Sequence, residues 1–538
     1  MKRSTHLLGK KFGIQILWCL WMVLFSDNVS YAQELKFSIK NVLFIGNETI
    51  DDTELFSEIE FIFGREVTFA ELELALSKVD QLYSQQGMLA SVYFPPQDIT
   101  DGQLFIKISE AKISDIIIDQ KMTEMVPRSR ISKIVEHHNP PGTSLNLKRV
   151  QRSIGLLNDL PGVRSEIAMD AGSAQNQVNL IVSGQKISPF ASKLTLDNWG
   201  HASTGQIKKT VELVLNSPLK LADKISLTRV ISKGSGSTET KFELPIGYSG
   251  GRVTISALNL HYNLVDEFAD LETAGASNER SAVFFHPYFY SSSAVVNGTI
   301  AFKFSNSHTA SFGNTVSDKN IRTLNYNLEG MKANFGRDDS NLSWSIGVTH
   351  GLLDLSRNSE ELDADNGGLR TNGLFYKANF SLNYSSVFAE TWQAGLNLRG
   401  QFANKNLDSS QEFSLGGAQA IRSFPTSEAS GDEGAVLKLE IKKNYPNIGI
   451  VSFFVEKGWI RRNKTPIVGN ADGPNVYQIN GLGVGLNKTI SSNWSLNGSI
   501  ARKIGFNPRP SEQPNGQLTD NDKSDTDYKL WLAIVGRF

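Results

Sequence analysis

The sequence predicts a β-rich membrane protein in which two N-terminal α/β domains precede a 16-stranded antiparallel transmembrane β-barrel with an inward-folded long loop. Three observations predict this fold class. In residues 189–538 apolar and polar residues alternate with a period of two, in segments of about ten residues, as in membrane barrels. The connections between these segments are short and long in turn. Residues 37–184 instead contain two copies of one α/β pattern.

The start of the chain has the features of a secretory signal peptide. Its apolar run, residues 14–25, is too short to span a bilayer as a helix, follows basic residues and precedes the small-x-small site Ser30-Tyr31-Ala32. We expect cleavage after Ala32, with an uncleaved anchor as the alternative. The only cysteine, Cys19, lies in this segment, so the mature chain should have no disulfide, thiol nucleophile or thiolate metal site.

Loss of residues 1–32 would remove four basic side chains and Asp27, which changes the net charge from −1 to −4. A nucleic-acid partner requires a concentrated basic face. We therefore expect no nucleic-acid partner.

The first α/β domain is expected at residues 37–112. Thr68 and Glu71 match a capping box that starts its second helix, and Gly87 ends that helix. Its expected elements are a strand, two helices and two strands, at 37–44, after Asp52, 68–87, 90–94 and 104–108.

The second α/β domain is expected at residues 113–184 and repeats the same order. Its expected elements are a strand, two helices and a final strand, at 116–118, 130–137, 147–157 and 178–183. Each domain presents sheet edges, and an exposed edge can bind an extended peptide through main-chain hydrogen bonds. Two generic α/β domains remain the alternative interpretation.

Sixteen strands are expected in the barrel domain, residues 189–538. We place them at 190–198, 206–215, 224–233, 238–247, 252–263, 279–289, 294–305, 321–334, 341–353, 372–384, 391–403, 434–443, 449–458, 477–488, 493–501 and 526–538. Turns after even strands are short, whereas from the fifth strand on the connections after odd strands are long and polar, such as 306–320 and 354–371. Outer-membrane barrels sort their loops in this way, and a soluble sandwich has no reason to do so.

An even strand count puts both ends of the barrel on the short-turn side, together with the two α/β domains. That side should therefore be the periplasm. The last strand ends in an aromatic residue, Phe538, with Tyr528, Leu530, Leu532 and Ile534 on the same face.

The long connection at residues 404–433 contains a glycine-bearing segment with a single arginine. Its marked residues are Leu415, Gly416, Gly417, Ile421, Arg422, Ser423 and Phe424. In the strand at 449–458, alternation places Phe454, Glu456 and Gly458 toward the lumen. A buried cation needs a carboxylate, and the two-point arginine–carboxylate pair is the strong form of this contact. We predict that Arg422 points inward and contacts Glu456, with a solvated arginine as the alternative.

These motifs resemble those of a known family. Four short segments of the first domain match the first polypeptide-transport-associated (POTRA) domain of two-partner secretion transporters: Tyr83 to Gly87, Pro95 to Gln97, Asp101-Gly102 and Ser109 to Ala111. The loop motif and the segment Phe453 to Gly458 resemble the paired motifs of the haemolysin-secretion (TpsB) transporters within the POTRA-plus-barrel superfamily. Leu196-Asp197-Asn198, Thr204-Gly205, Pro218-Leu219 and Asp223 match as well.

The resemblance implies an outer-membrane pore of a Gram-negative cell that exports a partner exoprotein from the periplasm to the surface. The POTRA domains would capture the client, and loop 404–433 would gate the lumen. The implied partners are the exoprotein, outer-membrane lipid and the barrel-assembly machinery, which would recognise Phe538. No cofactor is implied.

The sequence departs from the family pattern at three points. Ser423 stands where the family usually has glycine, and Glu456 where it usually has aspartate, which is one methylene shorter. Few residues separate Ala32 from the first domain, so we expect no N-terminal helix that plugs the pore.

Other functions are less well supported by the sequence. A barrel-assembly factor of the same superfamily usually has more N-terminal domains, and a passive porin has no need of them. No nucleophile elbow, metal constellation or phosphate loop suggests an enzyme, and the glycines from Gly481 to Gly485 alternate within a strand. The acidic residues Asp520, Asp522, Asp525 and Asp527 could bind calcium, but a hydrated surface loop is the stronger interpretation.

Overall fold

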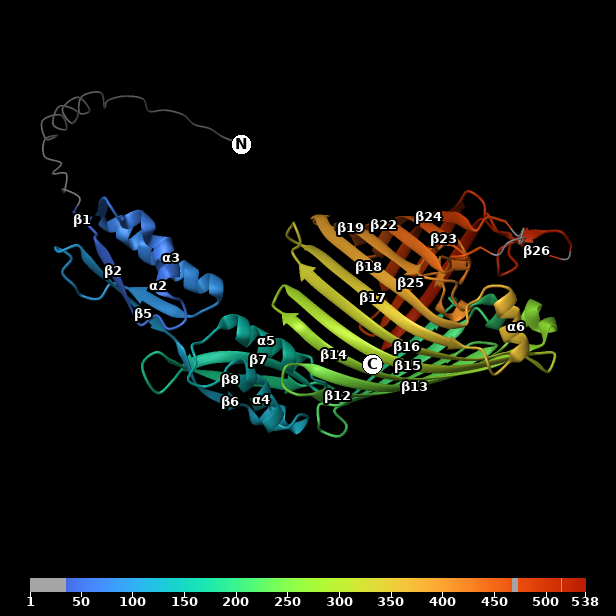
Figure 1. Cartoon of the computed structure of the whole chain (residues 1–538), viewed down its shortest axis with the longest axis horizontal. Coiled ribbons are helices and arrows are strands. Elements are labelled where there is room, and N and C mark those ends of the chain that lie inside the picture. Colours follow the sequence, from blue (N-terminus) through green and yellow to red (C-terminus); the bar gives the residue numbers. More distant parts are fainter. Residues whose placement is uncertain (1–34, 467–472, 514) are drawn as a thin grey trace, which may run out of the picture. The chain divides into compact units, whose positions relative to one another are not determined.

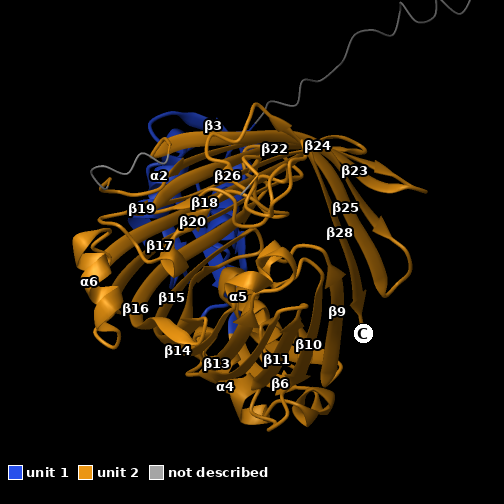
Figure 2. Cartoon of the chain, turned by 90° about the vertical axis from the view of Figure 1, so that its right-hand side faces the viewer, with its two compact units in different colours: residues 1–112, 144–146 blue, residues 113–143, 147–538 orange. Residues whose placement is uncertain are grey.

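The computed structural model describes residues 35–466, 473–513 and 515–538. The predicted signal peptide, residues 1–32, lies outside the described residues. The chain divides into two compact units, one of residues 1–112 with 144–146 and one of residues 113–143 with 147–538 (Figure 2). None of the described helices combines the length and apolar character needed to cross a bilayer.

The first unit is a three-stranded sheet packed against helices. Its elements are β1 (Lys36–Ser38), β2 (Asn41–Ile45), α2 (Asp52–Ile59), β3 (Glu66–Thr68), α3 (Phe69–Gln86), β4 (Ala90–Tyr93) and β5 (Gln103–Glu110) (Figure 1). The sheet order is β2-β5-β4, with β2 parallel to β5. Helix α3 begins with the predicted capping box of Thr68 and Glu71 and ends at Gly87, whose φ is 82°.

The prediction of one strand from Phe37 to Phe44 is wrong. The segment is divided into β1, which pairs with β3, and β2, which pairs with β5. At the break, the Gly102 carbonyl accepts hydrogen bonds from the amides of Lys40 (2.8 Å) and Asn41 (3.1 Å). A loop carbonyl therefore interrupts a pattern that local alternation could not distinguish from one continuous strand.

The resemblance motifs Tyr83 and Glu110 meet inside the first domain. Glu110 is buried and accepts hydrogen bonds from the Tyr83 hydroxyl (3.1 Å) and from the amides of Glu48 (2.8 Å) and Thr49 (3.0 Å). The carboxylate thus fastens helix α3 and the loop after β2 to the end of β5.

The second α/β domain opens the second unit and has the expected order with one addition. Its elements are β6 (Lys112–Ile118), α4 (Arg128–His138), α5 (Leu147–Asn158), β7 (Val163–Ala171) and β8 (Gln177–Lys186), in the sheet order β6-β8-β7. Strand β7 was not predicted. It pairs with β8 from Val163 to Ala171, so it forms one edge of the sheet.

The remainder of the chain forms the predicted closed barrel of sixteen antiparallel strands, which Figure 2 shows end-on. The strands are β9 (Phe190–Asp197), β10 (Lys208–Asn216), β11 (Lys224–Ile231), β12 (Ser235–Ile246), β13 (Gly251–Asn263), β14 (Thr273–Tyr290), β15 (Ala294–Ser311), β16 (Asn314–Ala333), β17 (Ser340–Asp354), β18 (Gly373–Ala389), β19 (Trp392–Ala403), β22 (Glu433–Tyr445), β23 (Gly449–Arg461), β24 (Val476–Thr489), β25 (Trp494–Ile504) and β28 (Tyr528–Arg537). Pairing of β28 with β9 closes the ring.

Three of the predicted long loops contain a helix or long stretches of strand. Strands β15 and β16 continue to a tight turn at Phe312-Gly313, so residues 306–320 form an extended hairpin and not a loop. Strand β14 likewise begins at Thr273, inside the predicted loop 264–278. Helix α6 (Ser359–Gly367) occupies much of 354–371. Where β14, β15 and β16 continue beyond the apolar band, their residues are polar and resemble a loop sequence. This explains why these parts of the strands were predicted as loops.

The two faces of the barrel wall differ as the alternation predicted, because residues paired across strands share a face. Large apolar side chains are exposed on the outer face, among them Phe302, Ile346 and Phe453. The inner face carries charged pairs such as Lys303 with Glu279, whose Nζ and Oε1 atoms are 3.2 Å apart.

Candidate functional site in the barrel lumen

The loop between β19 and β22 folds back against the inner wall of the barrel. Its apolar side chains form a small core with inward-facing residues of three neighbouring strands; the core consists of Phe413, Leu415, Ile421, Phe424, Ala429, Val436, Ile460 and Ile479. Strands β20 (Phe413–Ser414) and β21 (Ser430–Gly431) pair at its neck. We call residues 415–429 the loop tip, and residues 404–408 with 432–433 the loop base.

Each predicted residue of the Leu415-Gly416-Gly417 motif has a distinct structural role. Leu415 is fully buried in the core of the tip. A β-carbon on Gly416 would lie 2.3 Å from the Pro425 carbonyl oxygen, so only glycine fits there. Gly417 has a φ of 120°, a conformation that side chains with a β-carbon rarely adopt. The motif therefore allows the tip to fold tightly on itself.

Arg422 and Glu456 are in direct contact. Arg422 Nε lies 2.6 Å from Glu456 Oε1, and the Arg422 amide donates to Glu456 Oε2 at 2.6 Å. Glu456 is fully buried, and Arg422 is 14% exposed. One carboxylate thus holds both the side chain and the backbone of the loop, a charge-assisted two-point contact.

Two further groups complete the environment of the arginine. Its guanidinium carbon lies 3.2 Å from the centroid of the Phe454 ring, one of the predicted inward-facing residues. Its Nη1 lies 3.5 Å from Glu440 Oε1 on β22. A guanidinium stacked on an aromatic face and close to two carboxylates is strongly favoured over a hydrated one in this enclosed position.

Glycines on the wall provide the space into which the tip packs. A β-carbon at Gly458 would lie 3.0 Å from Leu415 and 3.2 Å from Ile421, so this glycine accommodates apolar side chains and not the arginine. A β-carbon at Gly481 would lie 2.7 Å from the Ser423 β-carbon. Of the alternating glycines of β24, Gly481 therefore makes room for Ser423, a role that the spacing alone did not indicate.

The tip also contacts the barrel near the seam between its first and last strands. Trp531 Nε1, on β28, donates to the Arg422 carbonyl at 2.7 Å. The Thr426 hydroxyl donates to the Trp199 carbonyl at 3.1 Å. Trp531 was not predicted, because no local pattern links it to a loop about a hundred residues earlier.

The loop base is held by a second set of charges. Asp432 is buried and accepts hydrogen bonds from the amides of Leu407 (2.8 Å) and Lys464 (2.6 Å). Glu433 is also buried and pairs with Arg461 (2.7 Å) and with the Lys464 ammonium (2.5 Å). Both carboxylates were missed, because they stand next to each other at the end of a loop and have no motif of their own.

An apolar cluster adds to this second attachment. Leu407 packs with Ile321, Leu353, Leu355, Phe375 and Ala403. The loop is thus attached to the wall at both its tip and its base.

Open space remains beside the docked loop. A cavity of about 620 Å³ lies between the tip and the opposite wall, with Lys208, Ser345, Asn379 and Arg399 in its lining. A second one, of about 440 Å³, is bordered by Arg422, Glu440 and Trp531. Their polar lining would suit an unfolded chain or water rather than an apolar ligand.

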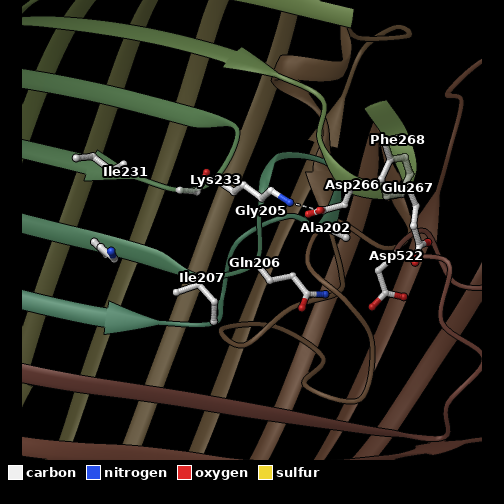
Figure 3. Close-up of a pocket in the computed structure, with 12 residues that line it drawn as sticks. Ala202, Gly205, Gln206, Ile207, Ile231, Lys233, Asp266, Glu267, Phe268 and Asp522 are labelled. Atoms are coloured by element: carbon white, nitrogen blue, oxygen red, sulfur yellow. Dashed lines mark hydrogen bonds and ion pairs between the residues drawn. The ribbon is translucent and has the colours of Figure 1, made fainter. Parts of the chain in front are cut away.

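A separate cavity of about 630 Å³ lies among the loops that follow the odd-numbered strands (Figure 3). Figure 3 shows Lys233 directed toward Asp266, with which it forms an ion pair, while Gln206 and Asp522 border the same space. The ion pair between Lys233 and Asp266 engages two of the charged groups that line this cavity.

In the acidic cluster considered for calcium, Asp520 is buried and the Asp522 side chain nearly so, and the interpretation as a hydrated surface loop is therefore wrong for these two of the four acidic residues. Lys503 pairs with Asp520 at 2.8 Å and Lys529 with Asp522 at 2.5 Å. In the part of the chain that the structure describes, no group of three or more metal-ligating side chains comes together.

Comparison with known proteins agrees with this architecture. The model of the family described as haemolysin secretion/activation protein ShlB/FhaC/HecB matches residues 176–487, and the model of the ShlB-type POTRA domain matches residues 37–111. The heme/hemopexin transporter protein HuxB of Haemophilus influenzae (strain 86-028NP) is 23% identical over 519 residues, which are 94% of this chain and 88% of HuxB. The outer membrane transporter CdiB of Dickeya dadantii (strain 3937) is 23% identical over 79% of this chain and 75% of its own.

A solved structure shows the same fold. CdiB from Escherichia coli superimposes with a TM-score of 0.76 at 17% identity, over 95% of this chain and 92% of that one. The chain is an outer-membrane transporter with its POTRA domains in the periplasm. It belongs to the haemolysin secretion/activation family ShlB/FhaC/HecB.

Proposed function

We propose that this secretion pore exports its partner exoprotein while loop 404–433 stays docked on the inner wall, held there by Arg422 and Glu456. The client would pass through the polar space beside the tip. No nucleotide is available in the periplasm to drive transport, so folding of the client outside would supply the driving force. Catalysis has no part in this proposal.

The observation that carries the proposal is the double contact of Glu456 with the side chain and the amide of Arg422. A loop held only by weak surface contacts would exchange between lumen and solvent. Removing one partner of a buried ion pair costs about 3–5 kcal/mol because the other charge is left uncompensated, so loss of Arg422 or Glu456 should release the loop from this position. The cavity of about 620 Å³ beside the docked tip supports passage without undocking.

Client capture is proposed for the sheet edges of the POTRA domains. In the second domain β7 is an edge strand, and residues 168–171 at its end are exposed. An extended client segment could add to this edge by main-chain pairing, with little requirement for sequence. The edge strand β4 of the first domain offers the same chemistry.

Two further partners belong to the proposal. HuxB is named as a heme/hemopexin transporter, and by analogy we propose a large secreted protein as the client here. Phe538 is exposed and packs edge-on against Trp494, with ring centroids 5.6 Å apart. We propose that this terminal aromatic is what the barrel-assembly machinery recognises.

The experiment that tests the proposal is export of the partner protein by the Arg422→Ala variant in correctly assembled barrels. We expect export to be lost or strongly reduced, with assembly verified by heat-modifiable migration of the folded barrel. The matched control is Lys303→Ala, which removes another lumen cation with a carboxylate partner but does not touch the loop. Wild-type export by Arg422→Ala would refute the role of the docked loop.

A further inference from the structure

Two arginines on the outer face of the barrel lie on either side of a phenylalanine. The register pairs Arg280 of β14 with Phe304 of β15, and Phe304 with Arg322 of β16. Paired residues share a face, and the flanking pairs Ala282 with Phe302 and Phe302 with Leu324 belong to the exposed apolar band. The two arginines are therefore directed toward the membrane side and not toward the lumen.

Their height along the wall follows from strand geometry. On β16 the outward-facing residues between Lys332 and Arg322 are Gly330, Leu328, Tyr326 and Leu324. Ten residues at about 3.4 Å each, on a strand tilted by about 45°, rise about 24 Å, which matches the apolar band of a membrane barrel, about 25 Å tall. Trp344, paired with Gly330, marks the periplasmic boundary. Arg280 and Arg322 consequently lie at the opposite boundary, in the outer leaflet.

Neither arginine is held in a contact ion pair, although Asp354 on β17 lies near enough to Arg322 for an electrostatic interaction. Arg280 donates only to neutral acceptors, Asn259 Oδ1 (3.3 Å) and the carbonyls of Leu258 (3.4 Å) and Glu279 (2.9 Å), and all three bonds use Nη1. Arg322 lies over the Phe304 ring, 5.7 Å from its centroid. Within the described residues, no carboxylate approaches either guanidinium to ion-pair distance. Adjacent strands are about 4.8 Å apart, so the two arginines are about 10 Å from each other.

The row above the arginines contains three amides and, on β17, the carboxylate of Asp354, which is paired with Asn320. Asn278, Asn306 and Asn320 are paired across the same three strands, two residues farther from the apolar band. The side-chain oxygens of Asn306 and Asn320 are buried in the wall without a hydrogen-bond partner. The next row contains Asp318, whose carboxylate already faces Arg357 (3.4 Å) and His308 (3.9 Å).

We propose that Arg280 and Arg322 bind a phosphate group of a phosphorylated glycolipid in the outer leaflet. Guanidinium groups bind phosphate through parallel hydrogen bonds, and the aromatic ring between them offers a surface for an acyl chain. A sugar ring placed above the phosphate would lie against the exposed Asn278 and the half-exposed Asn306 and Asn320, whose amides can hydrogen-bond its hydroxyl groups. This row of amides distinguishes a glycolipid from a phospholipid with a smaller headgroup. Strands β14, β15 and β16 continue beyond the membrane alongside this headgroup.

The test measures binding of a diphosphorylated lipid A to the delipidated full-length protein in detergent, by native mass spectrometry. We expect the Arg280→Gln/Arg322→Gln variant to lose at least about tenfold in affinity, the change that about 1.4 kcal/mol produces. The matched control is Lys332→Gln, which removes a cation from the other end of the same outward face and should bind as the wild type does.

Binding measurements on the wild-type protein test the proposal even if the double variant fails to fold. We expect a lipid A without phosphate, and phosphatidylglycerol, to bind at least tenfold more weakly than the diphosphorylated form, and millimolar inorganic phosphate not to displace it. Equal binding of phosphatidylglycerol or of the phosphate-free lipid, displacement by free phosphate, or equal losses in the double variant and in Lys332→Gln would each overturn the proposal.

Discussion

The tip and the base of loop 404–433 are attached to the barrel by opposite arrangements of charge. At the tip the loop supplies the cation, Arg422, and the wall supplies the carboxylate, Glu456. At the base the carboxylates Asp432 and Glu433 end the loop, and β23 and the residues after it supply the cations and amides. The charges at the tip centre on one arginine, which adds to an apolar core, whereas the base is held by two adjacent carboxylates that bind several amides and cations.

The two attachments also differ in which part of the loop should detach when each is removed. Without Arg422 or Glu456 the tip can leave the wall while the base still anchors both ends of the loop. Without Asp432 the ends of the loop loosen, but the contacts of the tip remain. This contrast yields three predictions, in order of decreasing effect.

Glu456→Ala should have the largest effect, because it leaves Arg422 enclosed without its main carboxylate. We expect a loss of about 3–5 kcal/mol of docking free energy, seen as faster proteolysis of residues 415–429 in the detergent-solubilised barrel. Glu456→Asp is the control, since the shorter side chain retains the charge. If the two residues act as a pair, the Arg422→Ala/Glu456→Ala variant will be less destabilised than the sum of the single changes. Additive losses would contradict the pairing.

Asp432→Ala should have an intermediate effect confined to the base. It leaves the buried amides of Leu407 and Lys464 without an acceptor, at about 1–3 kcal/mol for each unsatisfied group. We expect faster hydrogen exchange in residues 404–408 and 463–465, with unchanged protection at Arg422. Equal deprotection of tip and base would mean that the loop opens as one cooperative unit, and would contradict the independence of its two attachments.

Glu412→Gln should have the smallest effect, visible only as a change in pH dependence. Burial, together with the negative charges of Asp432 and Asp408 and against the positive charge of Arg462, raises the pKa of Glu412 to about 7. Because the folded-state pKa lies above that of the unfolded chain, about 4.5, the folded state binds the proton more tightly. Docking is therefore more stable as the pH falls through about 7, and this gain is absent above it.

Proteolysis of the loop on either side of that pH provides the measurement. The wild-type loop should be better protected at the lower pH, and the Glu412→Gln variant should lose this difference. An unchanged pH dependence in the variant would assign the effect to another group.

The same contrast explains what the sequence could predict. Strand parity placed Phe454, Glu456 and Gly458 on the inner face, and the family resemblance drew attention to Arg422, so the contact at the tip was predictable. The base was not, because Asn406 and Thr465, which exchange hydrogen bonds, are 59 residues apart and carry no shared pattern. Trp531 was missed for the same reason.

The barrel itself was predicted well where a membrane constrains the sequence and poorly where it does not. All sixteen strands were expected, but the hairpin of β15 and β16 beyond the apolar band was taken for a loop. Above the band neither face needs to be apolar, so period-two alternation disappears although backbone pairing continues to Ser311 and Asn314. In the first POTRA domain the break between β1 and β2 depends on the Gly102 carbonyl, which only the folded chain brings there.

We infer that the loop remains docked during export, and a disulfide between the tip and the wall tests this claim. A β-carbon at 458 would lie 3.0 and 3.1 Å from the two terminal carbons of Leu415, so sulfur atoms at 415 and 458 can meet without a large displacement. The only native cysteine, Cys19, lies in the predicted signal peptide. We predict that the Leu415→Cys/Gly458→Cys variant exports its partner equally well oxidised and reduced, with Leu415→Cys alone as control. Export that stops on oxidation and resumes on reduction would contradict the claim.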